Sequence, residues 1–528
     1  MLIRALNLFL SRVQSRSHVA GFVRKTFSRS KEPIGHRVFE SAINLLLSTR
    51  RYNEATSVLE GMLKEGYLPS MKTESKFLAV SLAGTDPSRE AYDKVWTHLQ
   101  PLFASPTFTE SDLLEVCSLV RTLQNAPRTC LALISMYVAS REAGYTASTQ
   151  LVCLAINMQV RLGMREEVQE TLAQFDLTAA PSRATHPFAS AISAMADIDP
   201  FDDDSVDRAL DMVRQREIRV DNSLYNALIK REIAKAHHHA GPLKEKRAWA
   251  LYRSLIELHK NFSTLRPDFY TFNGMWNLLI KSYTRRRKGG RNAYRTYREL
   301  FRDMLAIYFS PDNPTYHRDL PVDRLRDRAL LNVALKNFLV TRDYPGAFIV
   351  VKAFDMLHVP VGARTYLLIL KHILWRIYWN VRLLNKRARL TSSWGARFIG
   401  FQEGSSKVQM GRPLMYHLLT LNASLGPDRE KFGHRRKYHV PSVEMMNLQA
   451  AAPLGTVGRE GFSVVPLQRL LKRAAVANFE MKTRKNLEHK DAVLRVSEMI
   501  RTAKVEMIST ERRKARKSGW IQPYVQET

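Results

Sequence analysis

Cysteine is scarce in this chain of 528 residues, which contains only Cys117, Cys130 and Cys153 and no C-x-x-C arrangement. Three unevenly spaced thiols cannot form a disulfide framework, nor supply the four ligands of a structural zinc site. Glycine and proline are also few, at 23 and 22 residues, while hydrophobic residues make up 45% of the chain. This composition excludes a disulfide-stapled secreted scaffold, a collagen-like chain and a disordered chain, and it predicts a large folded protein.

Long apolar runs are missing as well. The apolar stretch 367–379 is interrupted by Lys371 and Arg376, and the uncharged stretch 143–160 begins with a largely polar half. A membrane-spanning helix needs about 20 predominantly apolar residues. The sequence therefore predicts no integral membrane insertion.

Acidic residues are outnumbered by Lys and Arg, 50 against 81, so the formal net charge is +31. The excess lies at the two ends, because residues 1–31 hold seven basic residues and no acid, and residues 371–528 hold 30 basic and 12 acidic residues. The part between them is nearly balanced. An excess of this size indicates a polyanionic partner, and its distribution predicts that most of the affinity comes from the C-terminal third.

The N-terminal segment 1–31 combines five Arg and five Ser with apolar residues at helical spacing. This pattern is typical of a mitochondrial transit peptide, and it lacks the continuous apolar block of a secretory signal. We therefore expect the mature protein in the mitochondrial matrix. The other interpretation is a basic helix that belongs to the mature fold or lies on a membrane surface.

Self-similar segments of about 35 residues follow. One apolar helical face runs from Phe39 to Leu46, and a second runs from Ala55 to Met62 after a polar turn. Gly66 suits a left-handed helix end, and Pro69 prevents continuation. These features predict a helical hairpin.

The junctions between such hairpins share a pattern. Segments 220–229, 267–273 and 311–317 each place an Asp shortly before an aromatic residue that opens the next helix, and segment 266–280 reads RPDFYTFNGMWNLLI. This pattern resembles the pentatricopeptide repeat family, whose units end in a Pro-Asp-like pair and begin the next helix with a Thr-Tyr-Asn-like triplet. The resemblance covers about 36–400 and is strongest from 188 to 370.

The resemblance implies an all-α fold, an α-solenoid of stacked helix-turn-helix repeats over residues 36–390. Residues 71–150 are degenerate, with helices indicated at 91–99 and 113–123. Excess spacing predicts loop insertions at 234–246 and 285–291, and helical periodicity resumes only near Arg328. We expect residues 391–465 to be an irregular basic extension, followed by one long basic helix over about 466–518.

The resemblance also implies that single-stranded mitochondrial RNA is the ligand, with about one base read per repeat. In this family two residues of each repeat recognise the base. One follows the aromatic residue that opens the first helix, and the other is the last residue of the repeat. We call these two residues the reading pair. Carried over one by one, the pairs are Glu40 with Ser70, Ala189 with Asp221, Asn226 with Asp268, Asn273 with Asp312, and Asn332 with Gly362.

Only two of these pairs, Asn226 with Asp268 and Asn273 with Asp312, match the family's Asn–Asp combination, which leans towards uracil. Tyr270 occupies the position that flanks the base and could stack on it. A local interpretation stays open, because Asn or Asp just before a helix is a good N-cap and the aromatic residues fit a core.

Two basic clusters are predicted to contact phosphates in a sequence-independent way: Arg285, Arg286, Arg287 and Lys288, and Arg435, Arg436 and Lys437. The other interpretation is a solvated surface, which explains most charge runs.

Motifs for catalysis are absent from the sequence: there is no phosphate-binding P-loop, no H-E-x-x-H and no G-x-S-x-G. Residues 371–528 contain only two Asp, which is too few for a fused metal-dependent nuclease. The runs 202–204 and 237–239 fit exposed loops better than metal sites. We expect no enzyme activity, no metal and no cofactor.

Two hypotheses follow. The first is a mitochondrial RNA-binding repeat protein that acts in transcript stability, processing or translation. The second is a structural subunit or assembly factor of the mitochondrial ribosome, which uses the repeats as a scaffold and the basic end on ribosomal RNA.

Overall fold

The computed structural model describes most of the repeat region and parts of the C-terminal third. The described residues are 34–48, 50–84, 89–121, 123, 125–142, 145–175, 184–238, 242–262, 265–285, 292–310, 321–384, 394–399, 441, 461–483 and 489–508. Within them the chain is helical apart from turns and one isolated bridge between Val361 and Phe462. The predicted transit peptide, residues 1–31, lies outside the described residues.

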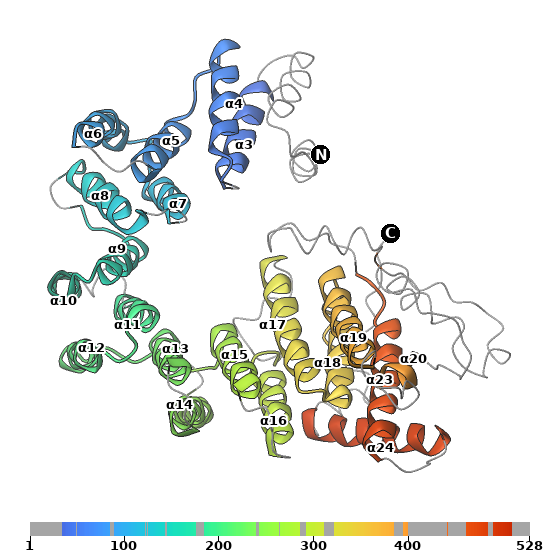
Figure 1. Cartoon of the computed structure of the whole chain (residues 1–528). Helices are drawn as coiled ribbons and strands as arrows, with labels where there is room; N and C mark the ends of the chain where they lie inside the picture. The colour runs from blue at the N-terminus through green and yellow to red at the C-terminus, as the bar shows by residue number, and fades with distance from the viewer. Residues whose placement is uncertain are drawn as a thin grey trace. The chain divides into compact units, whose positions relative to one another are not determined.

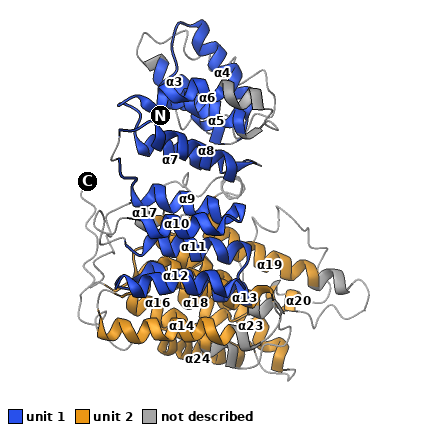
Figure 2. Cartoon of the chain, turned by 90° about the vertical axis from the view of Figure 1, so that its left-hand side faces the viewer, with its two compact units in different colours: residues 1–235 blue, residues 236–528 orange. Residues whose placement is uncertain are grey.

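The chain divides into two compact units, residues 1–235 and 236–528 (Figure 2). In unit 1 consecutive helices pair into hairpins, α3 with α4, α5 with α6, α7 with α8, α9 with α10 and α11 with α12 (Figure 1). We call the first helix of a hairpin its A helix and the second its B helix. The bounds are α3 (Ile34–Ser48), α4 (Tyr52–Lys64), α5 (Met71–Gly84), α6 (Arg89–Ala104), α7 (Glu110–Val120), α8 (Ala126–Ala139), α9 (Thr149–Leu162), α10 (Arg165–Gln174), α11 (His186–Ile198), α12 (Asp203–Gln215) and α13 (Asn222–His238).

The first hairpin has the predicted construction. The apolar faces of α3 and α4 meet in one cluster that includes Phe39, Ile43, Val58 and Met62. Gly66 then takes a positive φ of 82°, and the chain turns away from α4. A side chain at this position would be strained, which is why glycine suits the helix end.

Neighbouring hairpins of unit 1 are joined by hydrogen bonds at about the repeat spacing. Lys76 donates to the Asn44 side chain at 2.6 Å, 32 residues earlier. Ser190 donates to the backbone carbonyl of Cys153 at 2.9 Å, 37 residues earlier. Each hairpin therefore contacts mainly its sequence neighbours, as expected for a stacked repeat array.

Residues 71–150, which the sequence indicated as degenerate, form two regular hairpins. The helices predicted at 91–99 and 113–123 correspond to α6 and α7, and the structure adds α5 and α8. Thr109 and Asp112 form a complete capping box at the start of α7. The junction is therefore marked by capping chemistry in place of the Pro-Asp pair.

Unit 2 continues the pattern with longer helices. Their bounds are α14 (Pro242–Asn261), α15 (Phe269–Arg285), α16 (Asn292–Ile307), α17 (Pro321–Val340), α18 (Tyr344–Met356), α19 (Ala363–Leu384), α20 (Trp394–Ile399), α23 (Val465–Thr483) and α24 (His489–Met507). The loop insertion predicted at 234–246 was wrong for most of its length, because α13 runs on to His238 and α14 already begins at Pro242. Likewise α17 begins at Pro321, earlier than the predicted restart near Arg328.

The single long helix predicted over about 466–518 was also wrong, because the described residues form two helices, α23 and α24, which pack on each other and on α18. The reason is that both helices bury apolar side chains. The buried residues are Leu467, Leu470 and Leu471 on α23, and Val496 and Met507 on α24. One straight helix could not bring both faces onto α18. Residues 391–465 also contain the short helix α20.

No helix within the described ranges combines the length and apolar character needed to cross a membrane.

Candidate nucleic-acid interface

Residues at the repeat junctions act as N-caps of the A helices. Asp268 accepts hydrogen bonds from the backbone N–H and the hydroxyl of Thr271, at 3.0 and 3.1 Å. Asp221 accepts from the Leu224 N–H at 3.1 Å, and Ser148 accepts from the Leu151 N–H at 3.3 Å. The capping interpretation that the sequence left open therefore has direct geometric support at Asp268 and Asp221.

The first predicted reading pair is satisfied internally. Both carboxylate oxygens of Glu40 accept from Ser70, one from its N–H at 2.7 Å and the other from its hydroxyl at 2.9 Å. These two hydrogen bonds hold the junction between the first and second hairpins in place. The pair is therefore engaged in structure, in agreement with its poor match to the family's usual choices.

Of the remaining predicted readers, Asn226 and Asn273 are half-buried near the starts of α13 and α15. Tyr270 is 62% exposed on the first turn of α15 and lies against the ring of Phe269. Its exposure is compatible with the predicted stacking role. Asn226 belongs to unit 1 and its predicted partner Asp268 belongs to unit 2.

Asn332 is not placed where a base could reach it. Its side chain is buried, at 7% exposure, within α17. The helix begins at Pro321, so Asn332 lies three turns inside it and not near its start. The helix start had been set too late, and the burial of Asn332 does not support the predicted RNA contact.

Several predicted contacts lie outside the described residues: Asp312, Arg286, Arg287, Lys288, Arg435, Arg436 and Lys437. Arg285 is the last residue of α15, and its side chain is likewise outside the described part.

The A helices of unit 1 present lysines that carboxylates already engage. Lys76 contacts Glu115 at 2.5 Å, and Lys72 contacts Asp112 at 3.2 Å as well as Glu115. Burial alone would raise the pKa of Glu115, but its bonds to the two lysines outweigh burial and lower it. Lys230 similarly contacts Asp197 at 2.8 Å. Lys235 contacts Asp203 at 2.6 Å, so carboxylates engage each of these four lysines.

A shallow hollow of ≈ 270 Å³ lies on the A helices of unit 1. Burial raises the pKa of its cysteine, Cys153, to about 12, so the thiol stays protonated at neutral pH. The lining is mixed polar and apolar, from Leu114 and Ser118 of α7, its C-cap Arg121, Gln150, Cys153, Leu154 and Asn157 of α9, and Ser190 of α11.

The A helices of unit 2 carry a different surface. Neither α15 nor α19 contains an Asp or Glu, and Asp327 of α17 is buried and accepts from the Tyr308 hydroxyl at 3.0 Å. Lys336 of α17 and Arg364 and Lys371 of α19 are exposed. In the part of the chain that the structure describes, no carboxylate pairs with these three side chains.

Exposed aromatic rings accompany these charges. Trp375, Tyr378 and Trp379 of α19 are 57%, 47% and 41% exposed, and Tyr270 lies on α15. Helix α15 packs on α17, and α17 packs on α19, so the three helices are neighbours. Positive charge interleaved with aromatic rings is the composition of surfaces that bind single-stranded nucleic acid. We call this surface, formed by the exposed residues of α15, α17 and α19, the A face of unit 2.

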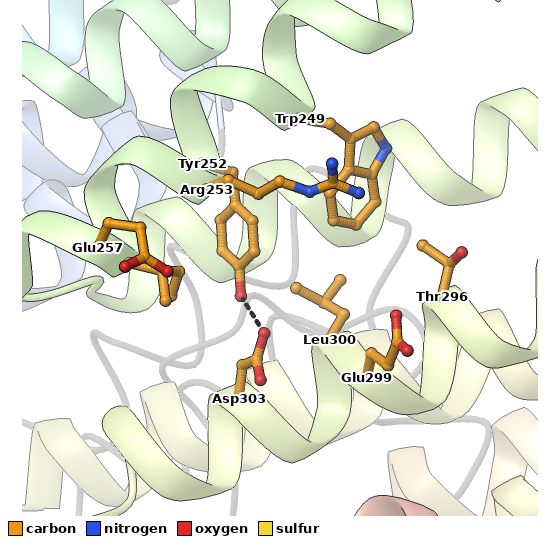
Figure 3. A pocket seen from close by; sticks show the side chains of 9 residues that line it. Trp249, Tyr252, Arg253, Glu257, Thr296, Glu299, Leu300 and Asp303 are labelled. Carbon is orange, nitrogen blue, oxygen red and sulfur yellow. Dashed lines mark hydrogen bonds between the residues drawn. The ribbon is translucent and has the colours of Figure 1, made fainter. Parts of the chain in front are cut away.

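The B helices of unit 2 carry charges of both signs. A hollow of ≈ 130 Å³ lies between α14 and α16. Its lining includes Glu257, Glu299 and Asp303 together with Arg253 (Figure 3). The Tyr252 hydroxyl donates to Asp303 at 3.1 Å, and burial raises the pKa of Asp303. Lys260 contacts Glu257 at 2.8 Å and Arg302 contacts Asp303 at 3.9 Å, so basic and acidic side chains are paired on this side of unit 2.

Sequence reasoning missed Lys336, Arg364, Lys371 and the α19 aromatic residues. Their signal was present: Arg364, Lys371, Trp375 and Trp379 recur at spacings of seven and four residues, which places them on one helical stripe. Without the start of α19 and the identity of its buried face, that stripe could not be assigned to the surface.

Among the described residues, no cluster of three or more His, Cys, Asp or Glu could hold a metal ion.

Comparison with known proteins gives structural likeness only. No protein-family model and no curated protein matches the chain. Two solved structures of the pentatricopeptide repeat protein PPR10 in complex with an 18-nt psaJ RNA element each align with 99% of this chain and 74% of their own, at 14% identity and a TM-score of 0.28. The structure of PPR10 from maize aligns with 70% of this chain and 61% of its own, at 12% identity and a TM-score of 0.19.

The fold is an all-α array of stacked helical hairpins. The hairpins themselves, their spacing and their capped junctions define it. In both units the all-α hairpins stack as in an α-solenoid.

Proposed function

We propose that this chain is an RNA-binding helical-repeat protein that holds single-stranded RNA on the A face of unit 2 and acts without chemistry of its own. The observation that carries the proposal is the combination on this face of exposed Lys336, Arg364 and Lys371 with exposed aromatic rings, and the lack of any acid in α15 and α19. The resemblance of the repeat junctions to RNA-binding pentatricopeptide repeats supports the same ligand.

Binding of labelled oligouridine to the full chain, followed by fluorescence anisotropy, tests this proposal. Replacing Lys336, Arg364 and Lys371 together by Gln should weaken binding by about tenfold or more at low salt, because phosphate contacts dominate the affinity. The matched control removes three exposed basic residues from the B helices, by Arg253→Gln, Lys260→Gln and Arg302→Gln. Equal weakening by both triple variants would contradict a binding site on the A face.

The cellular setting that we propose is the mitochondrial matrix, where the chain would stabilise, process or present a transcript. The basic, acid-free segment 1–31 supports this setting. A fusion of residues 1–35 to a fluorescent reporter should enter mitochondria, and a cytosolic reporter would contradict the proposal.

A second candidate function is a structural subunit or assembly factor of the mitochondrial ribosome. The compensated lysines of unit 1 favour it, because A helices whose charges are internally paired suit a scaffold better than a reading surface. Crosslinking in intact mitochondria followed by sequencing of the bound RNA separates the two. A footprint on one messenger supports the first function, whereas ribosomal RNA and co-sedimentation with a ribosomal subunit support the second.

A further inference from the structure

Three large aromatic side chains are exposed together on α19. Trp375, Tyr378 and Trp379 lie within little more than one helical turn, and the rings of Trp375 and Trp379 are 5.8 Å apart between centroids with an interplanar angle of 65°. Single exposed apolar residues are ordinary on protein surfaces, but a contiguous group this large indicates a binding surface.

The orientation of these rings is fixed by the opposite face of α19. There Ile369, Ile373 and Ile377 are fully buried. Arg376, between the two tryptophans in sequence, is 4% exposed, and its guanidinium carbon lies 4.0 Å from the ring centroid of Trp394. Its second nitrogen donates to the Asn478 side chain of α23 at 2.9 Å. A buried charge with these partners prevents α19 from rotating to hide the aromatic group.

The surroundings of the rings indicate which ligand they fit. Lys371 is exposed one turn before Trp375, and α19 has no acidic residue. An aromatic face binds any base by stacking, and a neighbouring cation binds the phosphate that follows it. A purely apolar protein partner would leave this Lys371 charge uncompensated, so single-stranded RNA fits the group better.

We propose that Trp375, Tyr378 and Trp379, with Lys371, form a stacking platform that anchors bases of single-stranded RNA without regard to their identity. The proposal rests on the proposed function and specifies where on the A face the strand is held. The planes of the two indole rings are inclined to each other by 65°, so bases stacked on the two rings are not parallel and do not stack on each other. The platform tolerates any base because every base has a π face.

The test uses the full chain, labelled oligouridine and oligocytidine, and the double variant Trp375→Ala with Trp379→Ala. The platform predicts about tenfold or more weaker binding to both RNAs, with an unchanged salt slope because no charge is removed. The variant Trp375→Phe with Trp379→Phe keeps a ring at each position and should retain most of the affinity. A matched control removes exposed apolar side chains elsewhere in unit 2, by Leu494→Ala and Val505→Ala on α24, and should bind as the parent chain does.

Photocrosslinking gives a direct readout of contact. An oligonucleotide that contains 4-thiouridine should crosslink to the peptide that carries Trp375 and Trp379, as identified by mass spectrometry. If the parent chain binds RNA but the Trp-to-Ala variant binds equally well, or if the crosslinks fall elsewhere, the platform is overturned while the proposed function stands. If the variant keeps RNA binding and loses a co-purifying protein, the surface is a protein-docking site and the platform is also overturned. If the parent chain binds no RNA, the proposed function and the platform fall together.

Discussion

At the scale of single residues, helix capping and the proposed recognition of RNA bases involve the same side chains. The family's reading position at the end of a repeat is also the N-cap of the next A helix. Asp268 and Asp221 both use their carboxylates on backbone N–H groups of the first turn. A carboxylate has further lone pairs, so a cap can still face a ligand. Stability and base preference must therefore be measured separately at these positions.

The Asp268 cap makes a first prediction. Asp268→Ala should lower the free energy of unfolding by about 1 kcal/mol, because the Thr271 N–H loses its acceptor, whereas Asp268→Ser keeps a capping oxygen and should change it by only a few tenths. Urea denaturation measures both variants. If Asp268 also reads a base, the Ser variant keeps its stability but loses preference for uridine over cytidine. A stable Ser variant with unchanged preference would leave capping as the only role.

His372 makes a second prediction at this scale. Burial lowers its pKa to about 4, and the positive charges of Arg376 and Arg342 add to the shift. Its Nε2 lies 3.1 Å from the Tyr344 hydroxyl, which also accepts a bond from Arg376. The Tyr344 hydroxyl thus donates to a neutral imidazole, and protonation would break this arrangement.

The folded-state pKa of His372 lies below the ordinary value of about 6.5, so protons bind the unfolded state more tightly. The stabilisation from this group is present above pH 6.5 and is lost as the pH falls towards 4, by roughly 3 kcal/mol at most. His372→Gln should flatten the dependence of unfolding free energy on pH in this window. The exposed residue His98, changed to Gln, is the control and should leave the pH profile as it is.

At the scale of elements, the C-terminal helices are part of the fold of unit 2. Helix α18, a B helix, is covered by α23 and α24. Arg298 of α16 ties this arrangement together, because it bonds Asp343 at the start of α18 at 2.8 Å and Glu506 of α24 at 2.6 Å. Burial opposes the charge on Arg298, but the two carboxylates outweigh burial and raise its pKa.

Arg298→Ala should therefore lower the free energy of unfolding by about 3 kcal/mol, because the buried carboxylate of Asp343 loses its partner. Glu506→Gln should cost less than about 1 kcal/mol, because that carboxylate is largely exposed. Hydrogen exchange should show faster exchange of α24 amides in the Arg298 variant. Equal effects of the two substitutions would mean that the exposed ion pair of Arg298 with Glu506, and not the buried pair with Asp343, accounts for the stabilisation.

At the scale of the whole molecule, the net charge of +31 is distributed by face as well as by segment. Unit 1 compensates lysines of its A helices, whereas unit 2 leaves basic residues exposed on its A face and pairs Lys260 and Arg302 with carboxylates on its B helices. The sequence predicted that affinity would come largely from the C-terminal third. In the described part of that third, α23 and α24 pack on α18, while the end of α19 carries the exposed Lys371, Trp375 and Trp379.

Salt dependence measures how many phosphates the protein contacts. Each cation removed from the RNA site should reduce the slope of log affinity against log salt by about 0.7 for a single strand. Replacing Lys336, Arg364 and Lys371 by Gln should therefore reduce the slope by about 2 between about 50 and 200 mM salt. The control variant with three substitutions on the B helices should leave the slope unchanged. A smaller slope in that control would indicate a general effect of net charge.

Local features of the fold could be predicted from the sequence. The hairpin of Phe39 to Met62, its end at Gly66 and the junction at Asp268 depend on residues that are close in the chain, so periodicity and capping chemistry identify them. Helix starts that lack a Pro-Asp signal were misplaced, at Pro321 above all. That single error put buried Asn332 among the predicted RNA contacts and left exposed Lys336 out.

By itself, the sequence determined that this is an all-α chain of helical hairpins with basic ends, because helices and hairpin turns depend on residues that are close together in the chain. Only the tertiary structure decided which face of each helix is exposed and which charges are paired. Lys76 meets Glu115 across 39 residues, and Arg376 meets Asn478 across 102. These residues become partners because segments that are distant in the chain pack together. Such packing leaves no periodic pattern in the sequence from which the partners could be predicted.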